Sequence, residues 1–159
     1  MTSEVKPVPD GYPTVTPYLT IKNAAQAIEF YQRAFGATVA MRIDDPNGKI
    51  GHAEIRIGDS PVMLSDEYPE MDARGPLAIG ATPVTIHLYV PDVDIMYARA
   101  IAAGAKQLRA VEDQFYGDRG GKLQDPFGHV WWISTRKENL TAEEVNRRAA
   151  AMFSGSGGS

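Results

Sequence analysis

The chain of 159 residues contains no cysteine, which excludes disulfides, iron–sulfur clusters, cysteine zinc sites and a thiol nucleophile. It has no apolar run of the roughly 18–20 residues that span a bilayer, so we expect no membrane partner. No apolar stretch follows a positively charged start, so we also expect no secretory signal. The net charge is −4 and Lys and Arg form no basic block, which argues against a nucleic-acid partner. A reducing cytoplasm is the simplest compartment for such a chain.

The two ends differ in composition from the rest. Residues 1–13 contain three prolines and predict an extended lead-in. Residues 154–159 are only Gly and Ser, which is typical of a flexible linker. Just before them, Thr141-Ala142-Glu143-Glu144 matches a capping box and opens an alanine-rich helix. We expect this helix, residues 141–153, to pack on the outside of the domain or on a partner chain.

The middle of the chain repeats one pattern after 69 residues, the separation of Asn23 and Asp92. Each copy reads strand, helix and three strands, with Asn23 or Asp92 as the expected helix N-cap and Gly36 or Gly104 as the helix end. The expected elements of the first copy are strands 14–21, 38–43, 52–57 and 62–65 with a helix over 24–35. Those of the second copy are strands 84–90, 107–111, 121–124 and 130–134 with a helix over 93–103. The modules are therefore 14–65 and 83–135, joined by a linker over 66–82.

The alternation of side chains assigns each strand two faces. The apolar set, expected to pack under the helices, includes Val15, Leu19, Ile21, Ala53, Ile55, Ile57, Val84, Ile86, Leu88 and Val90. The opposite face carries Thr16, Tyr18, His52, Glu54, Met63, Ser65, Thr85, His87, Tyr89 and Trp132. If the two halves curl together, this second face lines a concave cavity, the typical form of a small-molecule site.

These features resemble the vicinal oxygen chelate superfamily. The resemblance is carried by the duplicated unit, by Ala27-Ile28-Glu29-Phe30-Tyr31 with Phe35-Gly36-Ala37, by residues 52–59, and by Asp125-Pro126-Phe127-Gly128-His129 before a tryptophan strand. It covers residues 14–135, and the chain is most similar to the glyoxalase/bleomycin-resistance proteins of the PhnB-like type. The resemblance implies an α+β fold of two tandem βαβββ modules that form a cupped mixed sheet with helices on its outer face. It also implies a homodimer as the common assembly.

Metal-using members of that superfamily take ligands from the first and fourth strands of each module. The corresponding positions of this chain are Thr16, Met63, Thr85 and Trp132. None is a strong ligand, so we expect no metal cofactor there. His52, Glu54 and His87 are the minimum set for a displaced divalent-metal site. The alternative is that both histidines form hydrogen bonds to Glu54 or Ser65 in a polar cavity.

Two further segments are unusual. Residues 114–121 combine two aromatics, an acid–base pair and three glycines. Arg119 of this segment could hold an anion with two parallel hydrogen bonds, or it could pair with Asp118 or Glu54 and only hold the loop. The acidic segment 66–72 is a candidate lid or a solvated linker.

Three functions remain open. The first is binding of a small aromatic or cationic molecule, with Tyr18, His52, Glu54, Ser65, His87, Tyr89, Tyr116, Arg119 and Trp132 as candidate ligand-binding residues. The second is a divalent-metal-dependent lyase or isomerase at His52, Glu54 and His87. The third is a metal-free enzyme with His87 and Glu54 as catalytic acid–base groups and Arg119 as oxyanion stabiliser. We favour binding because it needs no metal ligands.

Overall fold

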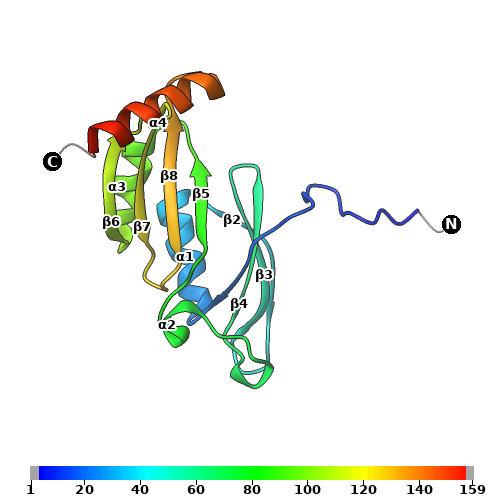
Figure 1. Cartoon of the computed structure of the whole chain (residues 1–159). Coiled ribbons are helices and arrows are strands. Elements are labelled where there is room, and N and C mark those ends of the chain that lie inside the picture. Colours follow the sequence, from blue (N-terminus) through cyan, green and yellow to red (C-terminus); the bar gives the residue numbers. More distant parts are fainter. Residues whose placement is uncertain (1–3, 157–159) are drawn as a thin grey trace. The chain divides into compact units, whose positions relative to one another are not determined.

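The computed structural model describes residues 4–156, which divide into two compact units. Unit 1 contains the residues up to Thr82 together with Pro126–Gly128, and unit 2 contains Pro83–Asp125 and the residues from His129 onward. Each unit holds a four-stranded mixed sheet and a helix that packs on it (Figure 1). The α+β fold with two strand–helix–three-strand modules is therefore confirmed.

Unit 1 contains sheet 1, whose strand order is β1-β4-β3-β2. Its elements are β1 (Tyr18–Ile21), α1 (Ala24–Phe35), β2 (Thr38–Asp44), β3 (Ile50–Ile57) and β4 (Ser60–Asp66). β1 runs parallel to β4, whereas β3 is antiparallel to both of its neighbours. A short 3-10 helix, η1 (Pro69–Met71), and helix α2 (Pro76–Ile79) follow in the segment that was expected to be a linker.

Unit 2 contains sheet 2, whose strand order β5-β8-β7-β6 repeats that of sheet 1. Its elements are β5 (Thr85–Tyr89), α3 (Val93–Ala103), β6 (Lys106–Asp113), β7 (Asp118–Gln124), β8 (Val130–Arg136) and α4 (Ala142–Ser156). β5 is parallel to β8, and the other pairs are antiparallel. None of the helices over residues 4–156 is long and apolar enough to cross a membrane.

Helix α1 has the predicted bounds, but it begins differently from the prediction. Gly36 ends the helix with a φ of 69°, as expected for a glycine after a helix. Asn23 does not cap it, because this residue has a φ of 67° and its side chain makes no capping hydrogen bond. The buried carboxylate of Asp66 replaces it, accepting hydrogen bonds from the backbone N–H of Ala24 at 3.0 Å and of Ile50 at 2.7 Å. Asp66 is therefore the last residue of β4 and not part of a lid.

Helix α3 follows the sequence prediction more closely. Asp92 accepts a hydrogen bond from the N–H of Ile95 at 3.2 Å, which confirms it as the N-cap. The hydroxyl of Thr135, at the end of β8, accepts a second hydrogen bond from the N–H of Val93 at 2.9 Å. In each module, the start of the helix is therefore hydrogen-bonded to the strand that runs parallel to the first strand of that module.

The predicted core face is confirmed in β1 and β3, is only half-buried at Ile86 and Leu88 in β5, and is wrong just before β1 and β5. Leu19, Ile21, Ala53 and Ile55 are buried. Val15 is 81% exposed and Val84 is 61% exposed, because β1 begins only at Tyr18 and β5 only at Thr85. Pro17 explains the late start of β1, since proline has no N–H for the ladder, and pairing begins at its carbonyl, which accepts from Met63 N–H at 2.9 Å.

The C-terminal helix α4 begins as predicted and ends later. The hydroxyl of Thr141 accepts a hydrogen bond from Glu144 N–H at 3.1 Å. The helix continues to Ser156, so the predicted flexible linker is wrong for residues 154–156, and residues 157–159 lie outside the described range. Arg148 fixes α4 to the preceding chain, because its guanidinium donates to Glu138, Glu144 and the carbonyl of Phe115.

Candidate functional site

The face of sheet 1 opposite α1, called here the open face of sheet 1, carries the predicted polar set of the first module. On β3, Ala53 and Ile55 are buried on the α1 side, and Glu54 lies between them on the other side. The strand register places Met63 of β4 opposite both Tyr18 of β1 and Glu54. Tyr18, Glu54 and Met63 therefore stand side by side across three strands.

A chain of hydrogen bonds connects four side chains on this face. The hydroxyl of Tyr12 donates to Glu54 Oε1, and Glu54 Oε2 lies 3.1 Å from His52 Nε2. The other imidazole nitrogen, Nδ1, lies 3.0 Å from the Tyr18 hydroxyl. The predicted bond between His52 and Glu54 is confirmed. Tyr12 is not among the predicted site residues, because residues 1–13 are predicted only to form an extended lead-in.

Glu54 is only 8% exposed, yet its surroundings favour the charged form. The hydrogen bond from Tyr12 lowers the pKa of Glu54, burial opposes this, and the hydrogen bond with His52 lowers the pKa further. The same bond to the carboxylate raises the pKa of Tyr12. At neutral pH the pair is therefore a carboxylate that accepts a hydrogen bond from a protonated phenol.

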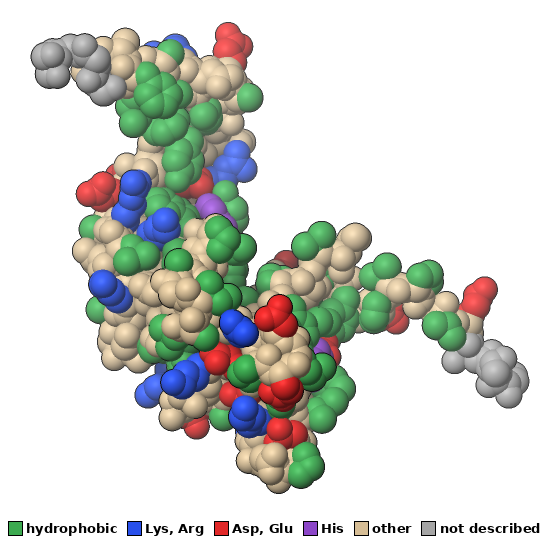
Figure 2. Space-filling view, turned by 60° about the horizontal axis from the view of Figure 1, so that its bottom comes forward, with side chains coloured by type: hydrophobic (Ala, Val, Ile, Leu, Met, Phe, Trp, Pro, Cys, Tyr) green, Lys and Arg blue, Asp and Glu red, His purple; other side chains and the backbone are tan. Residues whose placement is uncertain are grey.

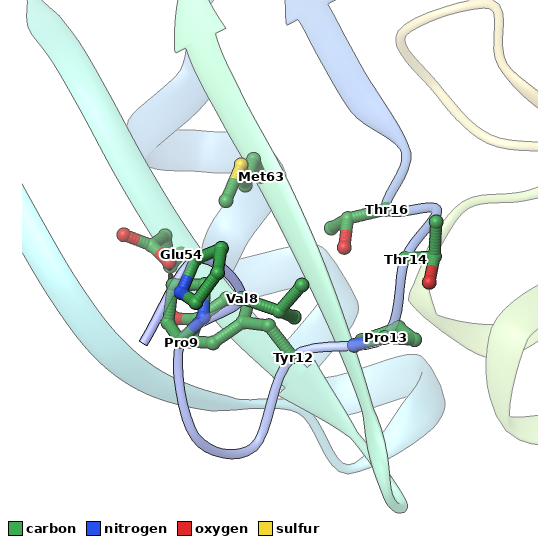
Figure 3. Close-up of a pocket in the computed structure, with 9 residues that line it drawn as sticks. Val8, Pro9, Tyr12, Pro13, Thr14, Thr16, Glu54 and Met63 are labelled. Carbon is green, nitrogen blue, oxygen red and sulfur yellow. Dashed lines mark hydrogen bonds between the residues drawn. The ribbon is translucent and has the colours of Figure 1, made fainter. Parts of the chain in front are cut away.

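A pocket of about 610 Å³ opens beside Glu54. It is lined by Pro7, Val8, Pro9, Tyr12, Pro13, Thr14, Thr16, Glu54 and Met63. Val8, Pro9 and Tyr12 lie next to Glu54, and Thr14 and Thr16 come from the chain that leads into β1 (Figure 3). Glu54 is the only carboxylate among these described lining residues, and most of the others are apolar. The pocket therefore has the form of a small-molecule site, with an apolar wall and one polar group.

Residues 7–13, called here the N-terminal strap, form much of this wall. The guanidinium of Arg56 donates to the carbonyl of Gly11 at 3.3 Å, and its central carbon lies 5.3 Å from the ring centroid of Tyr12. The N–H of Tyr12 donates to the carbonyl of Pro9 at 3.2 Å and closes a turn. Side chains along the segment leading to the N-terminus are mainly hydrophobic (Figure 2). The available sequence signal was Tyr12 itself, the one aromatic residue in the lead-in.

A second pocket of about 350 Å³ lies on the same unit. It is lined by Tyr18, Thr20, Gly51, Ser65, Tyr68, Met71 and Ala73. Ser65 donates to the carbonyl of Asp66 at 3.0 Å, and Tyr68 donates to Asp45 Oδ2 at 2.9 Å. Burial and the bond to Asp45 raise the pKa of Tyr68 to about 12. Ser65 thus lines a hydroxyl-rich pocket and not the one beside Glu54.

The corresponding face of sheet 2, the open face of sheet 2, holds His87. Its Nε2 lies 2.7 Å from the hydroxyl of the fully buried Ser134, a partner that the sequence did not predict, and the predicted bond to Glu54 or Ser65 of unit 1 stays a prediction. The ring stacks on Tyr89 with centroids 4.6 Å apart. Burial lowers the pKa of His87, and the charge of Asp118 partly opposes this. The environment of His87 therefore disfavours the charged imidazolium.

Trp132 covers the neighbouring part of the open face of sheet 2. A Cβ added to Gly120 would lie only 2.7 Å from the indole Nε1, so the ring packs directly on the glycine. Within the described part of the chain, this buried Nε1 has no hydrogen-bond partner. Tyr116 belongs to the same unit, where burial, followed by the charges of Asp118 and Tyr89, raises its pKa.

Arg119 is already paired, though not with the predicted partners. Its Nε and Nη2 donate to the carboxylate of Asp94 at 2.9 and 3.1 Å, and its Nη1 donates to Asp113 at 3.2 Å. The expectation of a bond to Asp118 of the same unit is therefore wrong. A pocket of about 480 Å³ adjoins Arg119 and also includes Lys137 and Glu138. Two carboxylates already occupy this guanidinium, so its role as an anion clamp stays a prediction.

The residues at the metal-ligand positions of unit 1 do not fit a divalent ion. Thr16, Met63 and Glu54 offer one hydroxyl, one thioether and one carboxylate around the same pocket. Divalent ions in proteins are held by several carboxylate, imidazole or carbonyl donors, which this set lacks. Among residues 4–156, no cluster of three or more His, Asp or Glu side chains could hold a metal ion. The alternative ligand set of His52, Glu54 and His87 includes residues from both units and stays a prediction.

Comparisons with known proteins agree with this architecture. A family model described as the Glyoxalase/Bleomycin resistance protein/Dioxygenase superfamily matches residues 13–133. The uncharacterized protein Mb0911c of Mycobacterium bovis is 43% identical over 145 residues, covering 89% of this chain and 93% of the relative. The crystal structure of TioX from Micromonospora sp. ML1 is similar with a TM-score of 0.61 and 26% identity, covering 81% of this chain and 100% of that one. The PhnB protein from Bacillus cereus shares the fold, with a TM-score of 0.63 and 16% identity over 77% of this chain and 99% of that one.

Proposed function

Because the chain belongs to the glyoxalase/bleomycin resistance protein/dioxygenase superfamily, we propose that it binds a small organic molecule in the pocket beside Glu54. This membership confirms the resemblance seen in the sequence. It does not define a reaction, since one fold carries many functions. The support for binding comes from the chemistry of the pocket.

The observation that carries the proposal is the buried carboxylate of Glu54 at an otherwise mainly apolar pocket. Its charge is screened less there than in water, so a ligand group that donates a hydrogen bond or carries a positive charge gains affinity. The apolar body of the ligand packs on the prolines of the strap and on Met63. We therefore expect a ligand with an apolar or aromatic body and one donor or cationic group.

Calorimetric titration with arylalkylamines and with carboxylic acids of matched size tests this function. We expect the amines to bind and the acids not to bind. Glu54→Gln keeps the side-chain size but removes the charge, and should weaken amine binding about tenfold or more, since a charged hydrogen bond contributes about 1.5–3 kcal/mol. Glu29→Gln on the exposed side of α1 is the matched control and should bind like the wild type. Equal affinity of Glu54→Gln and wild type would contradict the proposal.

A second candidate, a metal-free acid–base enzyme, is favoured by the hydrogen-bond chain from Glu54 through His52 to Tyr18. In this mechanism Glu54 accepts the substrate proton and returns it to the product, while His52 and Tyr18 hold the carboxylate in place through their hydrogen bonds. Turnover of α-keto or hemithioacetal substrates tests it, and His52→Gln should reduce the rate about 100-fold. If the substrates bind but are not turned over, small-molecule binding stays the proposed function and acid–base catalysis is contradicted.

The metal-dependent lyase or isomerase remains a separate proposal that needs His87 beside His52 and Glu54. Elemental mass spectrometry of the wild type and of His87→Ala tests it. One divalent ion per chain that is lost in the variant would support it. Protein that stays metal-free after incubation with nickel, zinc, manganese and iron would contradict it. The homodimer and the cytoplasmic location stay predictions from the sequence.

A further inference from the structure

The side chain of Tyr12 occupies the polar end of the candidate pocket. Its hydroxyl donates to Glu54, and the guanidinium of Arg56 lies over its ring. Glu54 and Arg56 are two residues apart on β3, so their side chains lie on the same face of sheet 1. Together they bind both parts of a phenol, because the carboxylate accepts from the hydroxyl and the cation covers the π-face.

The strap is attached to sheet 1 by few contacts, which would allow a free ligand to replace the Tyr12 side chain. Among the described residues, residues 7–13 make no backbone–backbone hydrogen bond to sheet 1; their one such bond is internal, from Tyr12 to Pro9. Their polar contacts with the sheet include the Tyr12 hydroxyl bond to Glu54 and the Arg56 bonds to the Gly11 carbonyl at 3.3 Å. Gly11, with a φ of 81°, permits the second contact, since a Cβ there would lie 3.0 Å from Arg56 Nη2. A small number of side-chain contacts therefore closes this end of the pocket.

We propose that Glu54 and Arg56 form a recognition site for hydroxylated aromatic molecules, which Tyr12 occupies until such a ligand replaces it. The inference rests on the proposed function, since the ligand enters the same pocket. A phenol is neutral at pH 7, because its pKa is about 10, and it can donate to the Glu54 carboxylate. An aromatic ring without a hydroxyl would leave Oε1 of that carboxylate without the donor that Tyr12 supplies, and is therefore bound more weakly.

The tethered Tyr12 competes with any free phenol. A short linker gives a tethered group an effective concentration in the millimolar range, so a weakly binding free ligand is partly excluded from the wild type. Removal of the Tyr12 ring should therefore raise the affinity for a free phenol. The affinity should rise by the factor by which the closed strap reduces the fraction of protein whose pocket is open to a free phenol.

The test uses p-cresol, which has the side chain of tyrosine, and toluene, which lacks only the hydroxyl. Methyl NMR of methionine-labelled protein reports binding at Met63, which lines the pocket, and Met152 on α4 is the internal reference. We expect p-cresol to bind Tyr12→Ala about tenfold more tightly than the wild type, and toluene to bind Tyr12→Ala at least about tenfold more weakly than p-cresol. In Tyr12→Ala/Glu54→Gln the difference between the two probes should shrink, because an amide oxygen accepts a weaker hydrogen bond than a carboxylate.

Lys6→Ala, a change next to the strap, is the matched control variant, because it removes the exposed ion pair with Asp10 of the strap without touching Glu54 or Arg56. It should bind p-cresol like the wild type. Equal affinity of Tyr12→Ala for p-cresol and toluene, or equal affinity of Tyr12→Ala and wild type for p-cresol, would overturn the inference.

Benzylamine separates this failure from a failure of the proposed function. If benzylamine shifts the Met63 signal of the wild type in a Glu54-dependent way and p-cresol binds neither protein, the pocket binds ligands and only the phenol inference is wrong. If none of the probes moves Met63 in any variant, both the inference and the proposed function are wrong.

Discussion

Sheets 1 and 2 have the same strand order but present different chemistry on their open faces. In sheet 1, Glu54 stands opposite Met63, and at the equivalent place in sheet 2 Lys122 stands opposite Trp132. The second module therefore carries a cation in place of the buried carboxylate, and an indole in place of a flexible thioether. A pocket adjoins Glu54 and Met63, whereas the Trp132 ring packs on Gly120. Two differences on adjacent strands therefore distinguish the face that carries the candidate pocket from the face on which an indole packs on glycine.

The two modules also hold their first helices by different means. Asp66 uses both carboxylate oxygens to accept from the N–H groups of Ala24 and Ile50. Its counterpart Thr135 accepts from Val93 and donates to the carbonyl of Val90 at 2.7 Å. A carboxylate with two backbone donors is the stronger arrangement, because charged hydrogen bonds contribute about twice as much as neutral ones. The stability of unit 1 therefore depends more on Asp66 than the stability of unit 2 depends on Thr135.

The largest expected effect is the loss of Asp66. Asp66→Ala leaves two backbone N–H groups without their partner and should lower the free energy of unfolding by about 3 kcal/mol or more. Asp66→Asn keeps one acceptor oxygen and should lose less. Thr135→Val, the counterpart in unit 2, should cost about 1–2 kcal/mol. Urea denaturation followed by circular dichroism measures the free energy of unfolding of all three variants. Equal losses of stability at Asp66 and Thr135 would contradict the claim that the two modules hold their helices with different strength.

A smaller effect is expected at Gly120. In Gly120→Ala the new methyl group meets Trp132 Nε1 at 2.7 Å and the carbonyl of Ile133 at 3.0 Å, so the free energy of unfolding should fall by about 1–3 kcal/mol. Gly51→Ala in sheet 1 is the control, because the nearest neighbour of its new methyl group would be the carbonyl of Ile43 at an ordinary 3.7 Å. It should change stability by less than about 0.5 kcal/mol. Trp132→Phe should relieve part of the loss in Gly120→Ala, and a neutral Gly120→Ala would show that the indole is not packed as described.

The smallest effect is a pH dependence that only the open face of sheet 2 should show. Burial lowers the pKa of His87 below its ordinary value, which is about 6.5. The neutral form is therefore favoured by folding, so the contribution of His87 is present above about pH 6.5 and is lost as the pH falls through the lower, folded-state pKa. Unfolding curves at a series of pH values from 8 to 5 should show a loss for the wild type that His87→Gln lacks. Parallel curves for the two proteins would contradict the assignment.

Local patterns in the sequence were sufficient for most of the fold. The apolar spacing of residues 24–35 and the glycine that follows defined α1, and the alternation of Ala53, Glu54 and Ile55 placed Glu54 on the open face. The exceptions have identifiable physical causes. Pro17 delays β1, and Asn23 adopts a left-handed conformation because Asp66, 43 positions further along the chain, supplies the cap.

The candidate site was less predictable because its contacts join distant segments. Tyr12 meets Glu54 across 42 residues, and Arg119 meets Asp94 across 25. No periodicity encodes such a pairing. The bond between His87 and Ser134 is an intermediate case, since the parallel register of β5 and β8, with Tyr89 beside Ser134, brings the two side chains within reach. A repeat of known period identifies equivalent strands, but it does not tell which side chain of a loop or lead-in will lie on them.

Asp66 has one further consequence. Its two oxygens join the first turn of α1 to the first residue of β3, two segments that are separated along the chain by β2 and a turn. A fluctuation that withdraws this one carboxylate exposes both amides to solvent at once. The protection of Ala24 and Ile50 against hydrogen exchange is therefore coupled, and the start of the helix and the start of the strand behave as one cooperative opening unit.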